Sequence, residues 1–284
     1  MPIDPQILLG AQLPPDEFAW DEDRVILYHL GIGAGFDSAD PDELRYVYEG
    51  ALKVLPSFAT IPPFAVMINV GTLPGMDVNP AMILHGEQLV TIHRPLPVRG
   101  RVTSEGKVVG VYDKGKGALV EVEVVSSDRE GPLFTNRSGI FVRGEGGFGG
   151  EALSSEQSWP QIPRRGPDTV SHSVTLPQQA LLYRLSGDKN PLHADPGFAA
   201  FAGFDRPILH GLSTFGVVCK AVVDSLLDGE VTAVFGFGGR FSGVVFPGET
   251  ITTSMWQEDA GIVISAAVAD RGVPVLSPAL LVLA

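Results

Sequence analysis

"LHGLSTFGVVCKAVVDSLL", residues 209–227, is apolar nearly all round when it is drawn as a helix. A helix of this kind is expected to be buried in the core. Three segments rich in β-branched residues follow it, "ETITTSMWQED", "IVISAAVAD" and "VLSPALLVLA", and the turn sequences "AG" and "RGVP" separate them. The end of the chain therefore predicts an α+β unit in which one long helix precedes an antiparallel sheet and packs on it.

A second set of strands is expected in the first half of the chain. "GRVTSEGKVVGVYD" (100–113) and "GALVEVEVVSS" (117–127) flank the turn "KGKG", and "LFTNRSGIFV" (133–142) follows "DREGP". This spacing of β-branched residues and turn signals predicts an antiparallel meander. Helices are expected over 40–52, which opens with acidic residues, and over 177–185.

Three short sequence similarities recur in the same order in both halves. "YHLGIG" begins at Tyr28 and "YRLSGD" at Tyr183, "LHG" begins at Leu84 and again at Leu209, and "RPLPVRG" and "RFSGVVFPGET" each precede strands. Their common order indicates a duplication. Two copies of one unit, each with a long helix on a curved antiparallel sheet, predict a double hot-dog fold of the α+β class.

The boundary between the two repeats is marked by a change in composition. Residues 143–167, "RGEGGFGGEALSSEQSWPQIPRRGP", are dense in Gly, Ser and Pro and separate two apolar regions. We therefore expect an N-terminal repeat over 1–142, a linker over 143–167 and a C-terminal repeat over 168–284. The glycines of the linker do not form a phosphate-binding loop, because the lysine of that motif is missing.

Composition excludes several classes of protein. The 284 residues are 44% hydrophobic and 19% charged, with a mean hydropathy of +0.19, which suits a large core and argues against disorder. A net charge of −13 argues against binding nucleic acid or anionic membrane through the overall field. The single cysteine, Cys219, excludes an intramolecular disulfide and fits a cytoplasmic protein.

Targeting and membrane signals are not found in the sequence. The N-terminus has no basic region of the kind that opens a secretory signal. No run of 18 apolar residues predicts a transmembrane helix, and the C-terminal "LLVLA" is not a peroxisomal tripeptide. We expect no membrane insertion.

"LSGDKNPLHADP", residues 185–196, places polar side chains between two apolar segments. Asp188 and His193 are five residues apart, and a glycine and a proline make this stretch a turn, so that both side chains can converge. Histidine exchanges protons near neutral pH, and a carboxylate beside it can orient a water or carry a second proton. Asn190 can fix the position of that water. The constellation predicts proton transfer with an activated water.

Other interpretations of this stretch remain. Ser186 is not in a G-x-S-x-G elbow and Cys219 lies in an apolar helix, so nucleophilic catalysis is disfavoured. No HExxH is present, and His193 with Asp195 supplies too few ligands for a metal. A purely structural role also stays open, because Asp and Asn are common turn residues and Asp195 can cap the next helix.

Gly211, in "ILHGL", also has two interpretations. It can be a glycine needed for close packing at the start of a helix. Alternatively, its N–H at the helix N-terminus can stabilise a developing oxyanion.

The two repeats differ at the polar stretch. When Leu30 is aligned with Leu185, the positions of Asp188, Asn190 and His193 are taken in the first half by Gly33, Gly35 and Ser38. The first repeat therefore lacks the polar set. We expect one catalytic and one degenerate copy, and space in the degenerate copy for a substrate tail.

The segment "YRLSGDKNPLHADPGFAAFAGFDRPILHGLSTFG", residues 183–216, resembles the signature of the type 2 enoyl-CoA hydratases. These are MaoC-like, (R)-specific 2-enoyl-CoA hydratases with a double hot-dog fold. The first half resembles the family as well, in "DELRYVYEG", "LHGEQLVTIHRPLPVRG", "VYDKGKGALVEVEV" and "GGFGG". The resemblance covers most of the chain, and its Y-x-L-S-G-D-x-N-P-L-H segment is long and specific.

The resemblance implies roles for four residues. Asp188 and His193 fall on the catalytic pair of the family, Asn190 on its water-orienting asparagine, and Gly211 on its oxyanion N–H donor. The implied reaction is reversible syn addition of water to a trans-2-enoyl-CoA, which yields an (R)-3-hydroxyacyl-CoA. No cofactor and no metal is implied. The acyl-CoA thioester is the expected partner, and we expect a homodimer.

The substrate's phosphates and acyl chain suggest further contacts. Lys189, Arg184 and Arg206 flank the motif and are candidates to meet the CoA phosphates, although each can equally be a solvated surface charge. The acyl chain is expected in a groove between the halves, lined by residues of "SFATIPPFAV" (57–66). A hot-dog thioesterase, a dehydratase acting on acyl-carrier-protein thioesters and a non-catalytic partner of a fatty-acid-synthesising complex are the alternatives.

Overall fold

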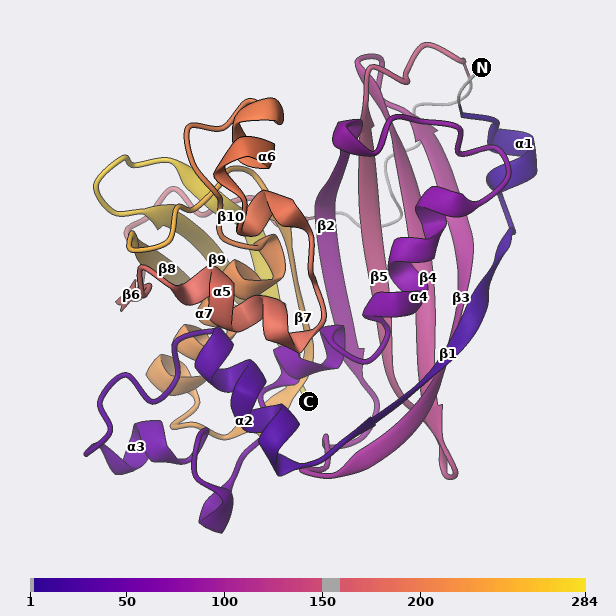
Figure 1. The fold of residues 1–284 in the computed structure, drawn as a ribbon. Coiled ribbons are helices and arrows are strands. Elements are labelled where there is room, and N and C mark those ends of the chain that lie inside the picture. The colour runs from indigo at the N-terminus through magenta and orange to yellow at the C-terminus, as the bar shows by residue number, and fades with distance from the viewer. Residues whose placement is uncertain (1–2, 150–158) are drawn as a thin grey trace.

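The computed structural model describes residues 3–149 and 159–284. Within these ranges one ten-stranded antiparallel sheet curves round the helices, in the strand order β1-β3-β4-β5-β2-β7-β10-β9-β8-β6 (Figure 1). The strands are β1 (Gln12–Trp20), β2 (Ile83–Ile92), β3 (Gly100–Asp113), β4 (Gly117–Asp128), β5 (Gly131–Arg143), β6 (Thr169–Val174), β7 (Val234–Phe241), β8 (Thr250–Glu258), β9 (Gly261–Val268) and β10 (Pro274–Leu283). The α-helices are α1 (Pro5–Leu8), α2 (Glu22–Gly31), α3 (Pro41–Leu44), α4 (Phe64–Ile68), α5 (Gln179–Tyr183), α6 (Pro196–Phe201) and α7 (Gly211–Leu226).

The strand order is the same when it is followed outward from the middle in either direction. β2 and β7 pair antiparallel at the centre, with Leu89 opposite Gly238. Outward from β2 the order is β5, β4, β3 and β1, and outward from β7 it is β10, β9, β8 and β6. In each half these are the last, the fourth, the third and the first strand in chain order. The two halves are therefore related by a pseudo-two-fold axis through the β2–β7 seam. The predicted double hot-dog arrangement is confirmed.

Helix α7 forms the centre of the second half. Its side chains Phe215, Val218 and Val222 are fully buried, and burial of a large apolar side chain contributes about 1.5–3 kcal/mol. Gly216 lets α2 approach closely, because a Cβ at this position would lie 2.5 Å from Cγ2 of Ile32. The helix expected over 209–227 is confirmed as Gly211–Leu226.

The first half differs in one detail, since it has no helix as long as α7 among its described residues. The corresponding region is divided into three short pieces, η2 (Pro56–Thr60), α4 and η3 (Asn69–Thr72). Pro62 and Pro63 explain the division, because proline lacks the N–H that a helix interior requires. The helix expected over 40–52 is also mostly absent, and only α3 and a 3-10 turn, Glu49–Ala51, form there.

One of the three repeated motifs is not structurally equivalent in the two halves. "LHG" at Leu84 lies in strand β2, whereas "LHG" at Leu209 leads into α7. The Tyr28 and Tyr183 segments do correspond, since both end a helix of the same layer, α2 and α5. Part of the expected linker, 150–158, lies outside the described residues. No helix within the described ranges is both long and apolar enough to cross a membrane.

Candidate active site

The stretch 185–196 folds as a loop between α5 and α6. Gly187 has φ +144°, a conformation that favours glycine, and it turns the chain out of the 3-10 helix η5 (Arg184–Ser186). A second 3-10 helix, η6 (Pro191–His193), then brings His193 back toward Asp188. The turn inferred from the sequence is therefore present, and both side chains converge as expected.

The Asp188 carboxylate and the His193 ring face each other across a short gap. Oδ2 of Asp188 lies 3.9 Å from Nε2 of His193, and Oδ1 of Asp188 accepts the N–H of Asn190 at 3.0 Å. His193 is buried and Asp188 half-buried. The backbone bond holds the carboxylate in place, while the 3.9 Å gap leaves both groups able to contact one water or substrate atom.

The second nitrogen of His193 fixes the tautomer of the ring. Nδ1 lies 2.9 Å from the carbonyl oxygen of Ile208, and because a carbonyl only accepts, Nδ1 carries the hydrogen. Burial lowers the pKa of His193, while the negative charge of Asp188 acts in the opposite direction. Nε2 is therefore the nitrogen that exchanges protons with Asp188 and the pocket.

Asn190 and Asp195 have different roles in the loop. Oδ1 of Asn190 accepts the N–H of Leu192 at 3.0 Å, which leaves the amide NH₂ as its hydrogen-bond donor at the pocket. Asp195 caps α6 by accepting the N–H groups of Gly197 and Phe198. The capping role expected for Asp195 is confirmed.

Gly211 is the first residue of α7, so no carbonyl of the helix can accept its N–H. A Cβ at this position would lie 3.4 Å from the Phe241 ring, which is ordinary van der Waals contact. Packing against Phe241 therefore does not require glycine here. The N–H lies at the positive end of a 16-residue helix, where negative charge is stabilised.

A pocket of about 200 Å³ brings these groups together at one end of the β2–β7 seam. Asp188, Asn190, His193 and Gly211 all line it, so the structure places all four predicted residues around one space. The first half contributes to the same pocket through Phe64 and the beginning of β2, and the other lining residues are Ile83, Leu84, His85, Leu192, Ile208, Leu209, Leu212, Thr214, Phe241, Gly243, Val244, Val245 and Val275.

His210 belongs to this site and was not predicted from the sequence. Its ring stacks on that of His193 with centroids 3.7 Å apart and 28° between the planes. Its Nε2 lies 3.3 Å from the main-chain oxygen of Asp188. Burial, and then the neighbouring His193, hold the pKa of His210 well below its usual range. In the sequence this histidine is marked by the repeated "LHG", which indicates a duplication and an oxyanion donor at Gly211 but no role for His210.

Asp188, His193 and His210 place an oxygen and two ring nitrogens within 4.8 Å of one another. Metal ligands must converge on one point about 2.1 Å away. The two stacked rings direct their in-plane lone pairs side by side instead of toward a common point. The cluster therefore suits proton transfer better than metal binding.

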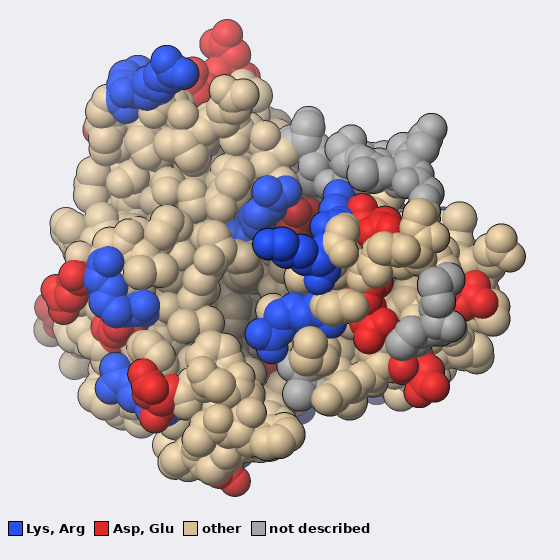
Figure 2. Space-filling view, turned by 90° about the horizontal axis from the view of Figure 1, so that it is seen from above, with Lys and Arg blue, Asp and Glu red and all other residues tan. Residues whose placement is uncertain are grey.

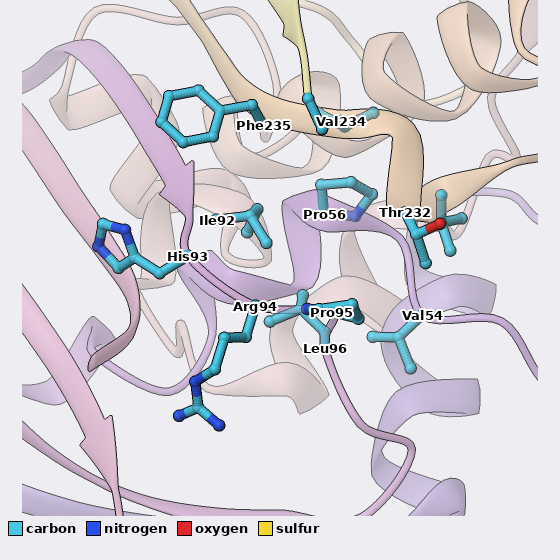
Figure 3. A pocket seen from close by; sticks show the side chains of 12 residues that line it. Val54, Pro56, Ile92, His93, Arg94, Pro95, Leu96, Thr232, Val234 and Phe235 are labelled. Carbon is cyan, nitrogen blue, oxygen red and sulfur yellow. The ribbon is translucent and has the colours of Figure 1, made fainter. Parts of the chain in front are cut away.

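The pseudo-two-fold axis relates this pocket to another at the opposite end of the seam. That pocket, of about 160 Å³, is lined where β2 ends and β7 begins, and most of its side chains are apolar (Figure 3). Arg94 and His93 point away from the apolar cluster, and Arg94 is paired with Asp128 and Glu130. The other lining residues are Val54, Pro56, Ile92, Pro95, Leu96, Val231, Thr232, Val234, Phe235 and Ala284.

Of the three positions aligned with the polar set, Gly33 lies at a third hollow. Gly33 lines it together with Lys220, whose ammonium group is paired with Glu43 at 2.6 Å and Asp224 at 2.8 Å. Glu43 also accepts the N–H of Gly35. The charged cluster beside this loop thus joins Glu43 of the first half to Lys220 and Asp224 on α7 of the second half.

The residues of "SFATIPPFAV", which are expected to line the acyl-chain groove, lie partly in the core and partly at the surface. Ala59 is fully buried in the core, where its carbonyl accepts a hydrogen bond from Asn136, and Ala65 is exposed. Of the whole segment only Phe64 lines the pocket that contains Asp188 and His193. The proline pair divides the segment, and most of its side chains pack into the core.

Two of the cations that flank the motif, Arg184 and Arg206, contact neighbouring groups of the protein. Arg184 donates to the main chain at Lys189, and Arg206 lies over the Phe246 ring at 4.7 Å. Lys114 and Arg240 line a hollow that shares Phe241 with the pocket of Asp188 and His193. Figure 2 shows lysine and arginine side chains beside the hollow between the two lobes of the molecule, despite the net charge of −13.

Comparisons with known proteins agree across both halves. Residues 18–144 match the family model described as the MFE-2 hydratase 2 N-terminal domain, and residues 159–275 match the MaoC like domain. The chain is 45% identical over 274 residues to an enoyl-CoA hydratase, ChsH3, of Mycobacterium tuberculosis, with 95% of each chain covered. It is 42% identical over 287 residues to the peroxisomal enoyl-CoA hydratase 2 of Arabidopsis thaliana, covering 95% of this chain and 93% of that protein.

Solved structures show the same architecture. A MaoC-like dehydratase from Phytophthora capsici superposes with a TM-score of 0.87 at 36% identity, covering 98% of this chain and 96% of that one. A Mycobacterium tuberculosis protein described as having a double hotdog fold superposes with a TM-score of 0.57 at 16% identity, covering 99% and 96%, and supports the fold alone.

Proposed function

This chain belongs to the family of MaoC-like type 2 enoyl-CoA hydratases, and we propose that it hydrates trans-2-enoyl-CoA to (R)-3-hydroxyacyl-CoA with Asp188 and His193 as the proton-transferring pair. The observation that supports this most is the placement of the pair. Both groups face one pocket, 3.9 Å apart, beside the N-terminus of α7.

The reaction requires one exchangeable proton on the pair. The partner without it accepts a proton from the water as the water oxygen bonds to Cβ. The other partner gives its proton to Cα as the double bond becomes single. The pair then again holds one proton, on the opposite partner, and exchange with solvent restores the first state.

The position of the pair supports the stereochemistry. Asp188 and His193 belong to one loop and form one wall of the pocket, so the proton and the hydroxyl group reach the same face of the double bond. His193 can act only through Nε2, because its Nδ1–H is bonded to Ile208. Asn190 supports the position of the water through its amide NH₂.

The thioester oxygen gains negative charge as the Cβ–O bond forms. We assign its stabilisation to the N–H of Gly211, which has no acceptor within α7. A preorganised donor aimed at developing charge lowers the activation barrier by about 2.7–4 kcal/mol in comparable sites.

The experiment that tests the function is incubation with crotonyl-CoA followed by chiral analysis of the product. We expect (R)-3-hydroxybutyryl-CoA and no release of free CoA. Release of free CoA would show a thioesterase instead, and (S)-product would contradict the proposed (R)-specificity. Matched crotonyl thioesters of CoA and of an acyl carrier protein distinguish the two carriers, and we expect the higher kcat/KM for CoA.

We also propose a cytoplasmic homodimer that acts in fatty-acid metabolism. The cytoplasmic location is supported by Cys219, which is buried and has no cysteine partner in the chain. The homodimer is supported by apolar side chains that a monomer leaves in water, above all Phe201 on α6, which is 76% exposed. Fractionation of cells and sedimentation velocity test the two proposals, and a single monomeric species would contradict the second.

A further inference from the structure

We propose that His210 is a positioning residue for the catalytic pair, which it holds through its ring on one side and its Nε2–H on the other. This inference rests on the proposed function in that it takes Asp188 and His193 as the pair. His210 does not need to touch the substrate, because its contacts are with the two residues that do.

The first contact is the stack with His193. The ring centroids are 3.7 Å apart at 28°, and the His210 ring also contacts Tyr183 at 4.8 Å. Tyr183 is fully buried, so it gives His210 a rigid support. The hydrogen bond from Nδ1 to the carbonyl of Ile208 still allows the His193 ring to rotate about the line of that bond. The stack with His210 limits this rotation.

The second contact is with the backbone of Asp188. Because a carbonyl only accepts, the 3.3 Å contact requires a hydrogen on Nε2 of His210. This bond fixes the peptide of Asp188, and the carboxylate is fixed separately by the N–H of Asn190. His210 thus contacts both partners of the pair, one through its face and the other through its edge.

His210 must remain neutral for this role. The groups near it are the His193 ring, Asp188, Arg184 and the Tyr183 ring. Burial lowers the pKa of His210, and the nearby charges of His193 and Arg184 lower it further. A neutral His210 does not repel His193 when that ring takes up a proton in the reaction, and its π face can stabilise the cation.

The same residue also begins the helix that carries the oxyanion donor. His210 is the N-cap of α7, and its carbonyl accepts the N–H groups of Ser213 and Thr214. Gly211, whose N–H faces the substrate oxygen in the proposed mechanism, is the next residue. A shift of His210 therefore changes the distance between the proton-transferring pair and the oxyanion donor.

Three variants separate these contacts. His210→Phe keeps an aromatic ring for the stack and loses the donor, His210→Gln keeps a donor at a similar reach and loses the ring, and His210→Ala loses both. We expect kcat with crotonyl-CoA to fall about 100-fold in His210→Ala with KM within about twofold, since a misplacement of about 1 Å costs about that factor. Each conservative variant should recover part of this loss. His172→Ala, on exposed β6, is the control.

A second readout does not depend on activity. Titration of His193 followed by NMR should move to higher pH in His210→Ala, because water then reaches the ring, and should stay near wild type in His210→Phe. An unchanged kcat and an unchanged titration in folded His210→Ala would overturn the proposal, as would a rise in KM alone. If His210→Ala does not fold, the contrast between the Phe and Gln variants decides. If the wild type does not hydrate enoyl-CoA, the proposed function fails while the titration still tests the coupling.

Discussion

Tyr28 and Tyr183, the first residues of the repeated sequence in each half, pack edge to face with ring centroids 6.1 Å apart and 60° between the planes. Both side chains are buried, and a Cβ at Gly31 would lie only 3.0 Å from Cα of Tyr183. The equivalent helices α2 and α5 therefore meet beside the pseudo-two-fold axis. The loop that follows α5 contains Asp188 and His193, and the loop that follows α2 lies beside Lys220.

Removal of either proton-transferring group should abolish most of the hydration. We expect Asp188→Asn and His193→Ala to fold normally and to lose about 100- to 10,000-fold in kcat. The double variant should lose far less than the product of the two factors, because the groups act as a unit. Steady-state kinetics with crotonyl-CoA measure this. Asp195→Asn, which keeps the cap of α6, should retain full activity, and near-wild-type turnover in either single variant rules out the mechanism.

Two glycines of α7 should respond in opposite ways to alanine. Gly211→Ala should keep its thermal stability, since its Cβ meets Phe241 at ordinary contact distance, but should lose about 10- to 100-fold in kcat as the methyl group crowds the thioester. Gly216→Ala should lower Tm by several degrees, because its Cβ would overlap Ile32. Thermal melting and kinetics on both variants test the distinction, and full activity in folded Gly211→Ala would show that the thioester does not lie close against residue 211.

Phe64 is one of the first-half residues that line the pocket, and we expect it to limit the length of the acyl chain. Phe64→Ala enlarges the catalytic pocket and Phe64→Trp narrows it. We expect the ratio of kcat/KM for a long-chain substrate to that for crotonyl-CoA to rise in the first variant and fall in the second, by roughly fourfold for each methylene gained or lost. Ala65→Leu, on the exposed face, is the control. Unchanged ratios in both folded variants mean that the tail binds elsewhere.

The chain should bind one substrate in spite of its duplication. Among the described residues, the pocket at the far end of the seam is lined by His93 and Arg94 but by no Asp or Glu side chain, and Gly33 and Gly35 stand at the positions aligned with Asp188 and Asn190. Titration with a tight product analogue should therefore saturate at one equivalent per chain. Two equivalent sites would contradict the assignment of a degenerate half.

Acid should destabilise the fold through His29. Both ring nitrogens are bonded, Nδ1 to the carbonyl of Tyr46 and Nε2 to the N–H of Leu55, and burial lowers its pKa from 6.5 to about 4. Between these pKa values the unfolded chain binds more protons than the folded one. The contribution of His29 to the free energy of unfolding is therefore complete above pH 6.5 and is lost as the pH falls toward 4. Between pH 7 and pH 5 the loss from His29 should be about 2 kcal/mol.

Urea unfolding of the wild type and His29→Gln at the two pH values measures this contribution. The variant should be less stable at pH 7 and should show a weaker dependence on pH. His172→Gln, which changes an exposed histidine, should behave as the wild type does. An equal pH dependence in His29→Gln would show that other groups cause the acid sensitivity.

The parts of the fold that the sequence predicted are those determined by local patterns. The segment 100–113 coincides with β3 because its alternation is regular and a Gly-rich turn follows it. Strand β7 was missed, since Gly236, Gly238 and Gly239 weaken any strand signal. The structure shows why they are there, because a Cβ at Gly239 would lie 2.7 Å from that of Ala279 and one at Gly238 only 2.8 Å from a carbonyl of β2.

The site, too, consists of residues that a local sequence pattern brings together and residues that only the tertiary fold brings there. Asp188, Asn190 and His193 lie in one turn, and their convergence follows from that turn. His210 comes from the next helix start, and Phe64 comes from the other half of the chain, so their places depend on tertiary packing that no local pattern encodes. Motif resemblance identified Gly211 but not the residue before it.

The β2–β7 seam has a consequence for the ancestry of the chain. Two separate copies of a single unit, paired through the same edge strand, would form a symmetric dimer with identical pockets at both ends of the joint. In this chain the joint lies within one polypeptide, where Leu89 is opposite Gly238. Fusion of two such copies would release the halves from having the same sequence, so that one could lack the carboxylate and the imidazole and still provide part of the wall of the other's pocket. The enzyme therefore contains, within one chain, the joint that would be a subunit interface in such a dimer, and its two halves are no longer identical.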